Sequence, residues 1–363
     1  MRQMRSTLEI KNFKCFTSQK INMSALTILV GGNGMGKSTI VQSLLLLRQC
    51  IEKRKEILLN GIYDLSLGTF DSIINCEATD NVLSFAIYDE DMQIIANTKL
   101  TIDETSSDNM MVMKQKGYFS KRNVGLLAPY FYYLSAERLG PRMSQRNTSL
   151  IYPNTGIYGE YTAQILYHYC YQKISEKRQN KLEKSLFLQK QVNAWLNTII
   201  PNVEVKAESN LSMQVSQILL KNSISNDYLQ STNIGFGISY ALPIIVTGLI
   251  AQEGCFFIVE NPEAHLHPAA QSAMGKFIAM LANSGLFVIL ETHSDHILDG
   301  IQIYAAQNSI PQDNIIINNF EIIDNNVNVT SIMYDDKYQY SMWPRHFMDQ
   351  SNINYIEFIN SLK

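Results

Sequence analysis

One run of nine residues in this chain is rich in glycine and ends in a lysine followed by two hydroxyl side chains. The run is Gly31-Gly32-Asn33-Gly34-Met35-Gly36-Lys37-Ser38-Thr39. It fits the pattern G-x-x-x-x-G-K-[ST], whose glycines let several backbone N–H groups point inward at one phosphate chain. In this pattern Lys37 reaches the β- and γ-phosphates of ATP, and the Ser38 hydroxyl binds Mg²⁺. We therefore predict that this run, called the P-loop below, binds ATP and Mg²⁺.

The segments on either side of the P-loop have the periodicity that such a site requires. Residues 26–30 form a short apolar run typical of a buried strand, and residues 40–47 have the pattern of a helix. A helix that starts at the P-loop directs its N-terminal partial positive charge toward the same phosphates. A chance match to the motif would rarely lie between a strand and a helix, so this context strengthens the prediction of a nucleotide-binding loop.

A second strand is expected to supply the acidic residue that holds Mg²⁺ in such a site. Residues 256–259 are apolar and end at Glu260, and residues 287–290 are apolar and end at Glu291, Thr292 and His293. The carboxyl ends of parallel strands meet along one edge of a sheet. We therefore predict that Lys37, Glu260 and His293 are neighbours and that Glu260 takes part in binding Mg²⁺.

The remaining apolar segments predict an α/β fold in which short buried strands alternate with helices. Strands are expected at residues 8–16, 99–103, 130–135, 255–260 and 286–290, with short strands over 201–221. A hairpin is expected over 81–96 with its turn at 89–91. A helical pattern covers 159–200, and helices are expected at 238–251, at 268–281 and from residue 295.

Composition limits the class of protein. The 363 residues are 46% hydrophobic with a net charge of −3, which gives no overall attraction to nucleic acid or an anionic membrane. The five cysteines include no C-x-x-C pair, as in a cytoplasmic protein with reduced thiols. No secretory signal is predicted, because the first ten residues include no apolar segment. No membrane span is predicted, because the apolar stretch 241–259 is interrupted at 252–254.

Five motifs in a fixed order resemble those of one ATPase family. They are N-G-M-G-K-S in the P-loop, S-A-E-R-L-G-P-R at 135–142, N-I-G-F-G-I-S at 233–239, E-N-P-E-A-H-L-H-P at 260–268 and E-T-H-S-D at 291–295. In this order they are similar to the ABC-class AAA ATPases related to SMC and RecF heads and to the overcoming-lysogenization-defect (OLD) proteins. Residues 342–349 are similar to a C-terminal segment of unknown function in many stand-alone members.

The resemblance implies a fold and its divisions. The expected fold is a P-loop NTPase of α/β class, with one ABC-type ATPase head across residues 1–363. Within this head we expect an antiparallel side sheet at 76–130, an inserted helical lobe at 159–200 and the C-terminal segment at 304–363.

The resemblance also implies a head-to-head homodimer, or a higher even oligomer, with two ATP molecules held between protomers. Glu260 would hold Mg²⁺ through water, and His293 would sense the γ-phosphate. Residues 233–239, called the signature loop below, would grip the partner's ATP through Gly235, Gly237 and Ser239. Residues 263–267, with Glu263 at their start, would lie at the dimer seam.

Two departures from the family pattern bear on hydrolysis. The residue after the acidic Glu260 is usually a glutamate that polarises water, but here it is Asn261. An asparagine side chain can orient water but cannot accept its proton. We therefore expect slow hydrolysis, unless Glu263 substitutes. The glutamine of the usual Q-loop is not identified; the segment near residues 67–68 is its expected place and lacks one.

Several residues allow a plainer interpretation. Ser239 could cap its helix, and Arg138 and Arg142 could bind phosphate or pair with acidic groups at the strand end. The lysine-rich stretch 173–190 could contact DNA or form a solvated helix face, and the tyrosines at 130–133 could belong to the core. A zinc site at His265, His267 and His293 lacks a matching ligand pattern.

Three functions remain open at this stage. The first is an ATPase sensor or scaffold that controls a separately encoded nuclease or toxin in prokaryotic anti-phage defence, as stand-alone members of the family often do. We expect the effector to be another chain, because the roughly sixty residues after Ile303 are too few for the Toprim nuclease of OLD proteins. The second is a RecF- or SMC-like DNA clamp. The third is a structural subunit that binds ATP without hydrolysing it.

Overall fold

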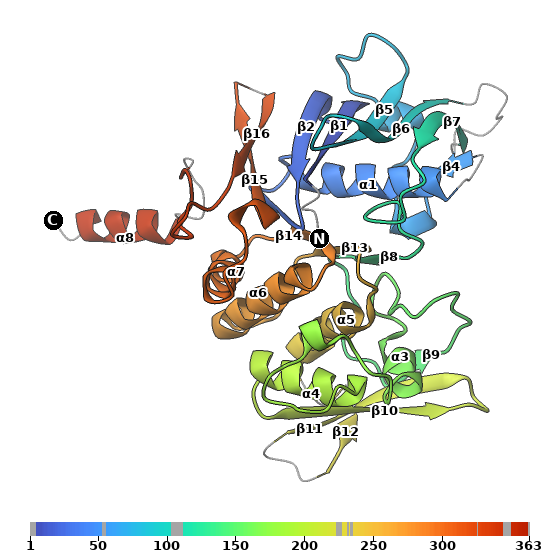
Figure 1. Cartoon of the computed structure of the whole chain (residues 1–363), viewed down its shortest axis with the longest axis vertical. Coiled ribbons are helices and arrows are strands. Elements are labelled where there is room, and N and C mark those ends of the chain that lie inside the picture. The colour runs from blue at the N-terminus through green and yellow to red at the C-terminus, as the bar shows by residue number, and fades with distance from the viewer. Residues whose placement is uncertain are drawn as a thin grey trace.

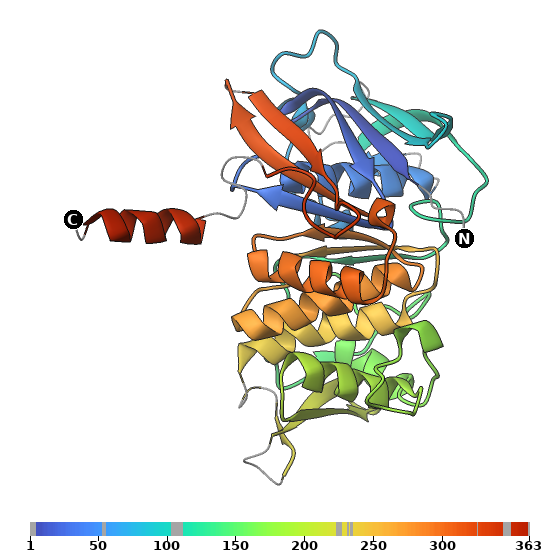
Figure 2. The ribbon, with the colours of Figure 1, turned by 60° about the vertical axis from the view of Figure 1, so that its left-hand side comes forward.

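The computed structural model describes most of the chain. The described residues are 5–52, 56–102, 112–222, 227–230, 232, 235–324, 326–343 and 350–361. Sheets and helices alternate along the long axis of the molecule, and helix α8 (Gln350–Ser361) projects away from the rest in both views (Figures 1 and 2). None of the described helices is long and apolar enough to cross a membrane.

The central sheet has six strands in the order β16-β15-β3-β14-β13-β8, and all neighbouring pairs except β15 and β16 are parallel. The strands are β3 (Leu26–Gly31), β8 (Phe131–Leu134), β13 (Phe256–Glu260), β14 (Phe287–Glu291), β15 (Ile315–Ile323) and β16 (Asn326–Ile332). The sequence predictions of β3, β8, β13 and β14 as short buried strands are therefore confirmed.

Both faces of the central sheet are buried, which explains the continuous apolar runs. Phe257 and Val259 of β13 pack into one hydrophobic cluster, and Ile258 between them packs into another. The first cluster includes helices α5 (Phe236–Ile250), α6 (Pro268–Asn283) and α7 (Asp295–Gln307). The second includes helix α1 (Lys37–Ile51), which starts at the P-loop. All four helices were expected from the sequence.

A second sheet, which is antiparallel, packs on the far side of α1 (Figure 1). Its order is β2-β1-β5-β6-β7-β4. The strands are β1 (Ser6–Phe13), β2 (Phe16–Met23), β4 (Glu56–Leu58), β5 (Leu83–Asp89), β6 (Ile94–Ile102) and β7 (Val112–Phe119). The short helices η1 (Ile62–Asp64) and α2 (Phe70–Ile73) lie between β4 and β5.

Two strand predictions in this region need correction. The single strand expected over 8–16 is two strands, because Asn12 and Lys14 adopt positive φ angles of 58° and 52° and the chain reverses between β1 and β2. The separate strand expected at 99–103 is the end of β6, which runs without a break from Ile94 to Ile102. The predicted hairpin and its turn are confirmed by the antiparallel pairing of β5 and β6.

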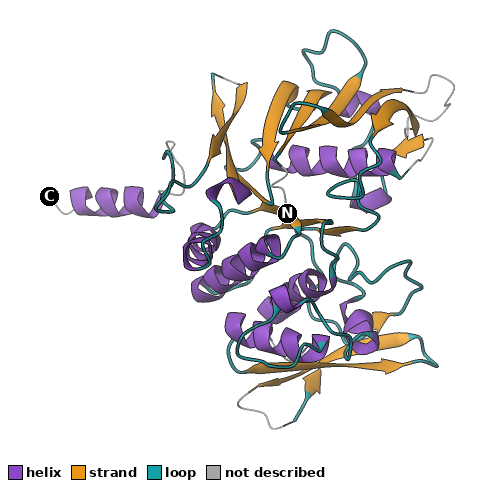
Figure 3. Cartoon of the chain, in the orientation of Figure 1, coloured by secondary structure: helices purple, strands orange, loops and turns teal. Residues whose placement is uncertain are grey.

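A third layer lies beyond the helices at the opposite end of the molecule, as Figure 3 shows. It contains α3 (Thr162–His168), η2 (Glu176–Arg178) and α4 (Leu188–Ile199). Its strands are β9 (Gln145–Arg146), β10 (Val203–Asn210), β11 (Val215–Asn222) and β12 (Leu229–Gln230). The short helix η4 (Gln312–Asn314) precedes β15. The predicted strands over 201–221 are confirmed as the β10–β11 hairpin.

The helical pattern expected between α3 and α4 is wrong, and with it the idea of a basic helix face at 173–190. Apart from η2, residues 169–187 form turns and irregular structure. Arg178 in this stretch is only 1% exposed and donates to the Ser284 hydroxyl and to the carbonyls of Gly248 and Ala251. This arginine therefore ties the irregular segment to the ends of α5 and α6, and it is unavailable to DNA.

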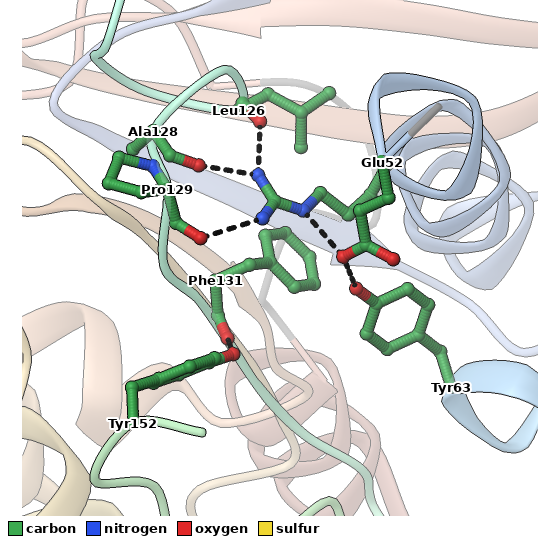
Figure 4. Close-up of polar contacts among 8 residues, drawn as sticks. Glu52, Tyr63, Leu126, Ala128, Pro129, Phe131 and Tyr152 are labelled. Carbon is green, nitrogen blue, oxygen red and sulfur yellow. Dashed lines mark hydrogen bonds and ion pairs between the residues drawn. The ribbon is translucent and has the colours of Figure 1, made fainter. Parts of the chain in front are cut away.

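A second buried arginine joins α1 to the segment before β8. The guanidinium of Arg48 donates to three backbone carbonyls, those of Leu126, Ala128 and Pro129. Its Nε bonds Glu52 at 3.1 Å, and Glu52 in turn accepts the Tyr63 hydroxyl at 2.5 Å (Figure 4). Because α1 begins at the P-loop, this network fixes the helix that carries Lys37 and Ser38 against the central sheet.

We expect Arg48→Met to lower the free energy of unfolding by about 3 kcal/mol, since it leaves buried carbonyls without donors. Urea titration monitored by circular dichroism measures this change. The control is Arg122→Met, which removes a half-exposed arginine paired with Asp89 at 2.9 Å and should cost less than about 1 kcal/mol. Equal losses in the two variants would contradict the role assigned to Arg48.

Candidate nucleotide-binding site

The P-loop curls between the end of β3 and the start of α1, and its glycines are required by the surrounding structure. Gly31 has a φ of 135°, and a Cβ there would collide with the carbonyl of Phe320 on β15. Gly36 has a φ of 92°, and a Cβ there would lie 2.9 Å from the Cys15 sulfur. Larger residues at these two positions would therefore be strained and would displace β15 or the β1–β2 turn.

Lys37 is folded into the loop that it closes. Its Nζ donates to the carbonyl of Gly31 at 2.9 Å and to that of Gly32 at 2.7 Å. Burial lowers the pKa of Lys37, and the charge of Glu291 acts in the opposite direction. The ammonium therefore lies inside the curl of backbone in which the sequence pattern expects the phosphates.

Ser38 faces a carboxylate to which the sequence reasoning gave no role. Its hydroxyl lies 3.1 and 3.3 Å from the two carboxylate oxygens of Glu291, the last residue of β14. Glu291 is only 6% exposed. Burial raises its pKa to about 7, and the charge of Glu260 adds to the rise. The sequence signal for Glu291 is its position at the end of the apolar run 287–290, but its pairing with Ser38 depends on the strand order.

Glu260 ends the neighbouring strand in register with Glu291. One carboxylate oxygen accepts the Tyr133 hydroxyl and the other accepts the backbone N–H of Ala136, each at 3.2 Å. Burial also raises the pKa of Glu260. Both contacts come from the end of β8 and the residues after it, so the segment carrying the S-A-E-R motif orients this carboxylate.

The oxygen groups at these strand ends fit a magnesium ion. The Ser38 hydroxyl and the carboxylates of Glu260 and Glu291 are hard oxygen ligands, which Mg²⁺ prefers, and a cation would relieve the repulsion between the two carboxylates. Within the described ranges, no cluster of three or more His, Cys, Asp and Glu side chains is placed to hold a metal by itself. The nucleotide phosphates and water would supply the remaining ligands of Mg²⁺, and the zinc alternative gains no support.

Glu263 lies beside His293 at this edge of the sheet. The Glu263 carboxylate accepts the Thr292 hydroxyl at 2.8 Å and the backbone N–H of His293 at 2.7 Å. Burial lowers the pKa of His293, the charge of Lys37 lowers it further, and Glu263 opposes both. The His293 imidazole is therefore neutral at neutral pH, in a form that can accept or donate a hydrogen bond.

Asn261 adopts a φ of 43° directly after β13. Its backbone N–H donates to the Glu291 carbonyl at 2.9 Å, while its side-chain oxygen is buried and has no partner among the described residues. A buried amide oxygen without a partner is costly and often marks a functional site. The structure thus places the Asn261 side chain directly after β13, at the position where the family pattern usually has a glutamate.

Arg138 of the S-A-E-R motif has a different role from either predicted one. It is 3% exposed and donates to three backbone carbonyls, those of Ser135, Glu260 and Asn261. Burial lowers its pKa to about 10. Arg138 is too buried for a phosphate group to reach it, and its hydrogen bonds go to backbone carbonyls and not to an acidic side chain. Its role is to hold the end of β13 against the end of β8.

The described part of the signature loop begins at Gly235, because Asn233 and Ile234 lie outside the described residues. Gly235 is the N-cap of α5, so Ser239 lies inside the helix, and no side chain of the described residues caps it. The interpretation of Ser239 as a cap is therefore wrong. A Cβ on Gly237 would lie 2.7 Å from the His265 carbonyl oxygen, so the start of α5 packs tightly on the loop after β13.

The segment expected to hold the Q-loop glutamine presents a carboxylate. Tyr63 and Asp64 have positive φ angles of 54° and 57° in η1, a conformation that non-glycine residues rarely adopt. The charge of Asp64 contributes to the raised pKa of Glu260, although less than burial does. Asp64 is therefore close enough to Glu260 to influence this edge of the sheet.

A glycine-rich loop at a helix N-terminus, a lysine inside it and acidic residues on adjacent strand ends define the site of a P-loop nucleoside triphosphatase. The family described as the AAA ATPase domain matches residues 4–123 and 157–298. The chain belongs to this family, as an ABC-class AAA ATPase. No curated protein matches the chain.

Two solved SMC heads have a similar fold. One is described as the SmcHead bound to the C-winged helix domain of ScpA, with a TM-score of 0.52 and 16% identity over 91% of this chain and 98% of that one. The other, derived from Pyrococcus furiosus, is an Smc head domain with an extended coiled coil bound to the C-terminal domain of ScpA. It has a TM-score of 0.54 and 14% identity over 99% of this chain and 100% of that one. The predicted P-loop NTPase fold resembling SMC heads is thus confirmed.

Glu291 should make the stability of the nucleotide-free protein depend on pH. Its folded pKa of about 7 lies above the ordinary value of 4.5, so its contribution is full below the ordinary value and is lost as pH rises through 7. We expect the free energy of unfolding to fall by about 2 kcal/mol from this group between about pH 5 and pH 8. Urea titrations at each pH measure the fall.

Glu291→Gln should remove this part of the pH dependence, because glutamine carries no titrating proton. The matched control is Glu357→Gln on the exposed surface of α8, which should leave the curve unchanged. A pH profile that is the same in Glu291→Gln and in the unmodified protein would show that another group is responsible.

Proposed function

We propose that this chain is a Mg²⁺-dependent, slowly hydrolysing ATPase that closes as a homodimer around two ATP molecules. The observation that carries the proposal is the grouping of Lys37, Ser38, Glu260 and Glu291 at the end of the P-loop. Lys37 supplies the charge for the phosphates, and the oxygen groups suit the metal that accompanies them. Bound Mg²⁺ would neutralise the charge that develops on the phosphates.

The signature loop supports the sandwich dimer. Among the described residues no side chain caps helix α5 at Gly235, and the first N–H groups of a helix are suited to bind an anion. Phe236 at this point is 56% exposed. In the proposed dimer, Gly235, Gly237 and Ser239 of one protomer face the γ-phosphate of the ATP bound by the other.

The proposed slow turnover follows from Asn261 and Glu263. Asn261 has no group that accepts a proton from water. Glu263 has one, but its two oxygens already accept the Thr292 hydroxyl and the His293 N–H. Glu263 would have to break one of these two hydrogen bonds before that oxygen could take a proton from water. The closed dimer would therefore persist long enough to act as a signal.

We propose further that the ATP-dependent dimer is the sensor or scaffold of an anti-phage system and controls a separately encoded nuclease or toxin. This part rests on the resemblance to stand-alone members of the family. Nucleotide contacts that exist only in the closed dimer would shift an open–closed equilibrium, and the effector would bind one of the two states. In such a system the chain would work in the cytoplasm with no membrane contact.

The similarity to SMC heads favours a second candidate, a DNA clamp. Both solved heads are described as bound to a domain of ScpA, so a partner protein on the head is part of this alternative. The clamp would bind DNA only with ATP, and its affinity would fall steeply with salt. In a third candidate, ATP holds a structural dimer together without being hydrolysed.

The test is the mass of the protein in solution without nucleotide, with ATP and Mg²⁺, and with ATP and Mg²⁺ in Lys37→Ala. We expect ATP to double the mass and Lys37→Ala to abolish the doubling, because the ammonium no longer binds the phosphates. Lys99→Ala, at an exposed position of β6, is the matched control and should behave like the unmodified protein.

Phosphate release from the same samples separates an ATPase from a protein that only holds ATP. Slow release that depends on Lys37 supports the ATPase, and no release over many hours supports the structural subunit. A mass that ignores ATP, or that Lys37→Ala leaves unchanged, would contradict the proposed switch.

A further inference from the structure

A row of rings joins the surface of the signature loop to the buried Arg138. The ring of Phe236 lies 5.6 Å from that of His265, and His265 lies 4.5 Å from Tyr240. The guanidinium carbon of Arg138 lies 5.5 Å from the centre of the Tyr240 ring. These separations are those of rings in contact and of a cation over an aromatic face. The four side chains form one continuous path, called the ring path below.

The outer end of the ring path is exposed. More than half of the Phe236 side chain is accessible, although Phe236 is aromatic and lies at the start of α5. The ring also closes on the loop after Arg138, since a Cβ on Gly140 would lie 2.9 Å from it. Any molecule that covers the N-terminus of α5 would therefore press on Phe236 and, through it, on His265.

Arg138, at the inner end of the ring path, holds the end of β13 with Glu260 and Asn261, which is called the metal-binding edge below. Arg138 donates to the carbonyl of Glu260 at 2.6 Å and to that of Asn261 at 2.6 Å. It also donates to the Ser135 carbonyl at 2.8 Å, next to Ala136, whose N–H orients the Glu260 carboxylate. A shift of this guanidinium would move both the backbone and the side-chain support of Glu260.

The middle of the ring path is tightly packed against the start of α5. His265 has a φ of 61°, and its carbonyl leaves no room for a side chain on Gly237. The start of α5 and the loop after β13 therefore move together. Because packed groups of this kind adopt discrete arrangements, a displacement at one end can be transmitted to the other.

We infer that Phe236, His265 and Tyr240 couple occupation of the signature loop to the position of Glu260 and Asn261 through Arg138. Each protomer would in this way align its own metal-binding edge only when its signature loop is covered by the partner's nucleotide. The inference rests on the proposed sandwich dimer. Tyr240 and Arg138 are positioning residues, since they act on Glu260 and Asn261 and touch no reacting group.

The test removes the ring in the middle of the path. Tyr240→Leu should lower ATP turnover at saturating ATP by about tenfold and raise the Mg²⁺ concentration for half-maximal binding by about fivefold. Binding is followed by the fluorescence of mant-ATP, which gives a readout even where hydrolysis is slow. The KM for ATP at saturating Mg²⁺ and the ATP-driven doubling of mass should stay within about twofold, because Tyr240 does not contact the P-loop. Tyr240→Phe keeps the ring and should restore both values.

The control is Tyr130→Leu, the same change at a half-buried tyrosine that packs 4.8 Å from Tyr152. A similar loss of turnover in this control would show a general effect of destabilisation and would overturn the inference. Unchanged turnover and unchanged Mg²⁺ dependence in Tyr240→Leu would also overturn it.

A double variant tests whether Tyr240 acts through Arg138. Arg138→Lys cannot donate to three carbonyls at once in the same fork geometry. If Tyr240 acts through Arg138, ATP turnover in the double variant Arg138→Lys, Tyr240→Leu should be no slower than in Arg138→Lys alone. If the two residues act independently, the two reductions in turnover would multiply. If the unmodified protein does not dimerise with ATP, the proposed function is wrong. If it dimerises but the effects of the Tyr240 and Arg138 substitutions on turnover multiply, only the inferred coupling through the ring path is wrong.

Discussion

Two carboxylates at the ends of adjacent parallel strands, opposite the P-loop, are the constraint on which the rest of this structure depends. Glu260 and Glu291 are held in register by β13 and β14, and burial raises the pKa of both. Without a cation, repulsion and burial favour the protonated form of Glu291. A divalent cation bound with its nucleotide would offset this repulsion and would take the place of the proton on Glu291.

The architecture serves to maintain this arrangement. The central sheet is covered on both faces, so its strands cannot slide without exposing apolar side chains to water. Arg48 fixes α1, which presents Ser38 to Glu291, and Arg138 fixes the end of β13, which presents Glu260. Each arginine donates to three backbone carbonyls, and these bonds compensate for the burial of the charged side chain. Arg48 is also paired with Glu52.

The sequence was sufficient to predict the parts of the site that depend on local pattern. The P-loop follows from nine consecutive residues, and the edge carrying Glu260 and His293 follows from two apolar runs that end in polar residues. The pairing of Ser38 with Glu291 was missed, because it requires the order of the strands, which places β14 between β3 and β13. Strand order is a property of the whole fold and leaves no local signal.

The errors have equally specific causes. Lysines and glutamates spaced through residues 173–190 are typical of a solvated helix, but Arg178 turns inward to bind the carbonyls of Gly248 and Ala251 and the chain follows it. The positive φ angles of Asn12 and Lys14 divide the expected first strand in two. In both cases a tertiary contact or turn overrides the local preference.

The most direct test of the central claim is the number of protons released when Mg²⁺ and nucleotide bind. Calorimetric titration in buffers of different ionisation enthalpy measures it. Because the folded pKa of Glu291 is about 7, we predict net release at about pH 6.5, little release at about pH 8.5, and clearly less release at about pH 6.5 in Glu291→Gln. Proton release that is equal in Glu291→Gln and the unmodified protein would contradict the account.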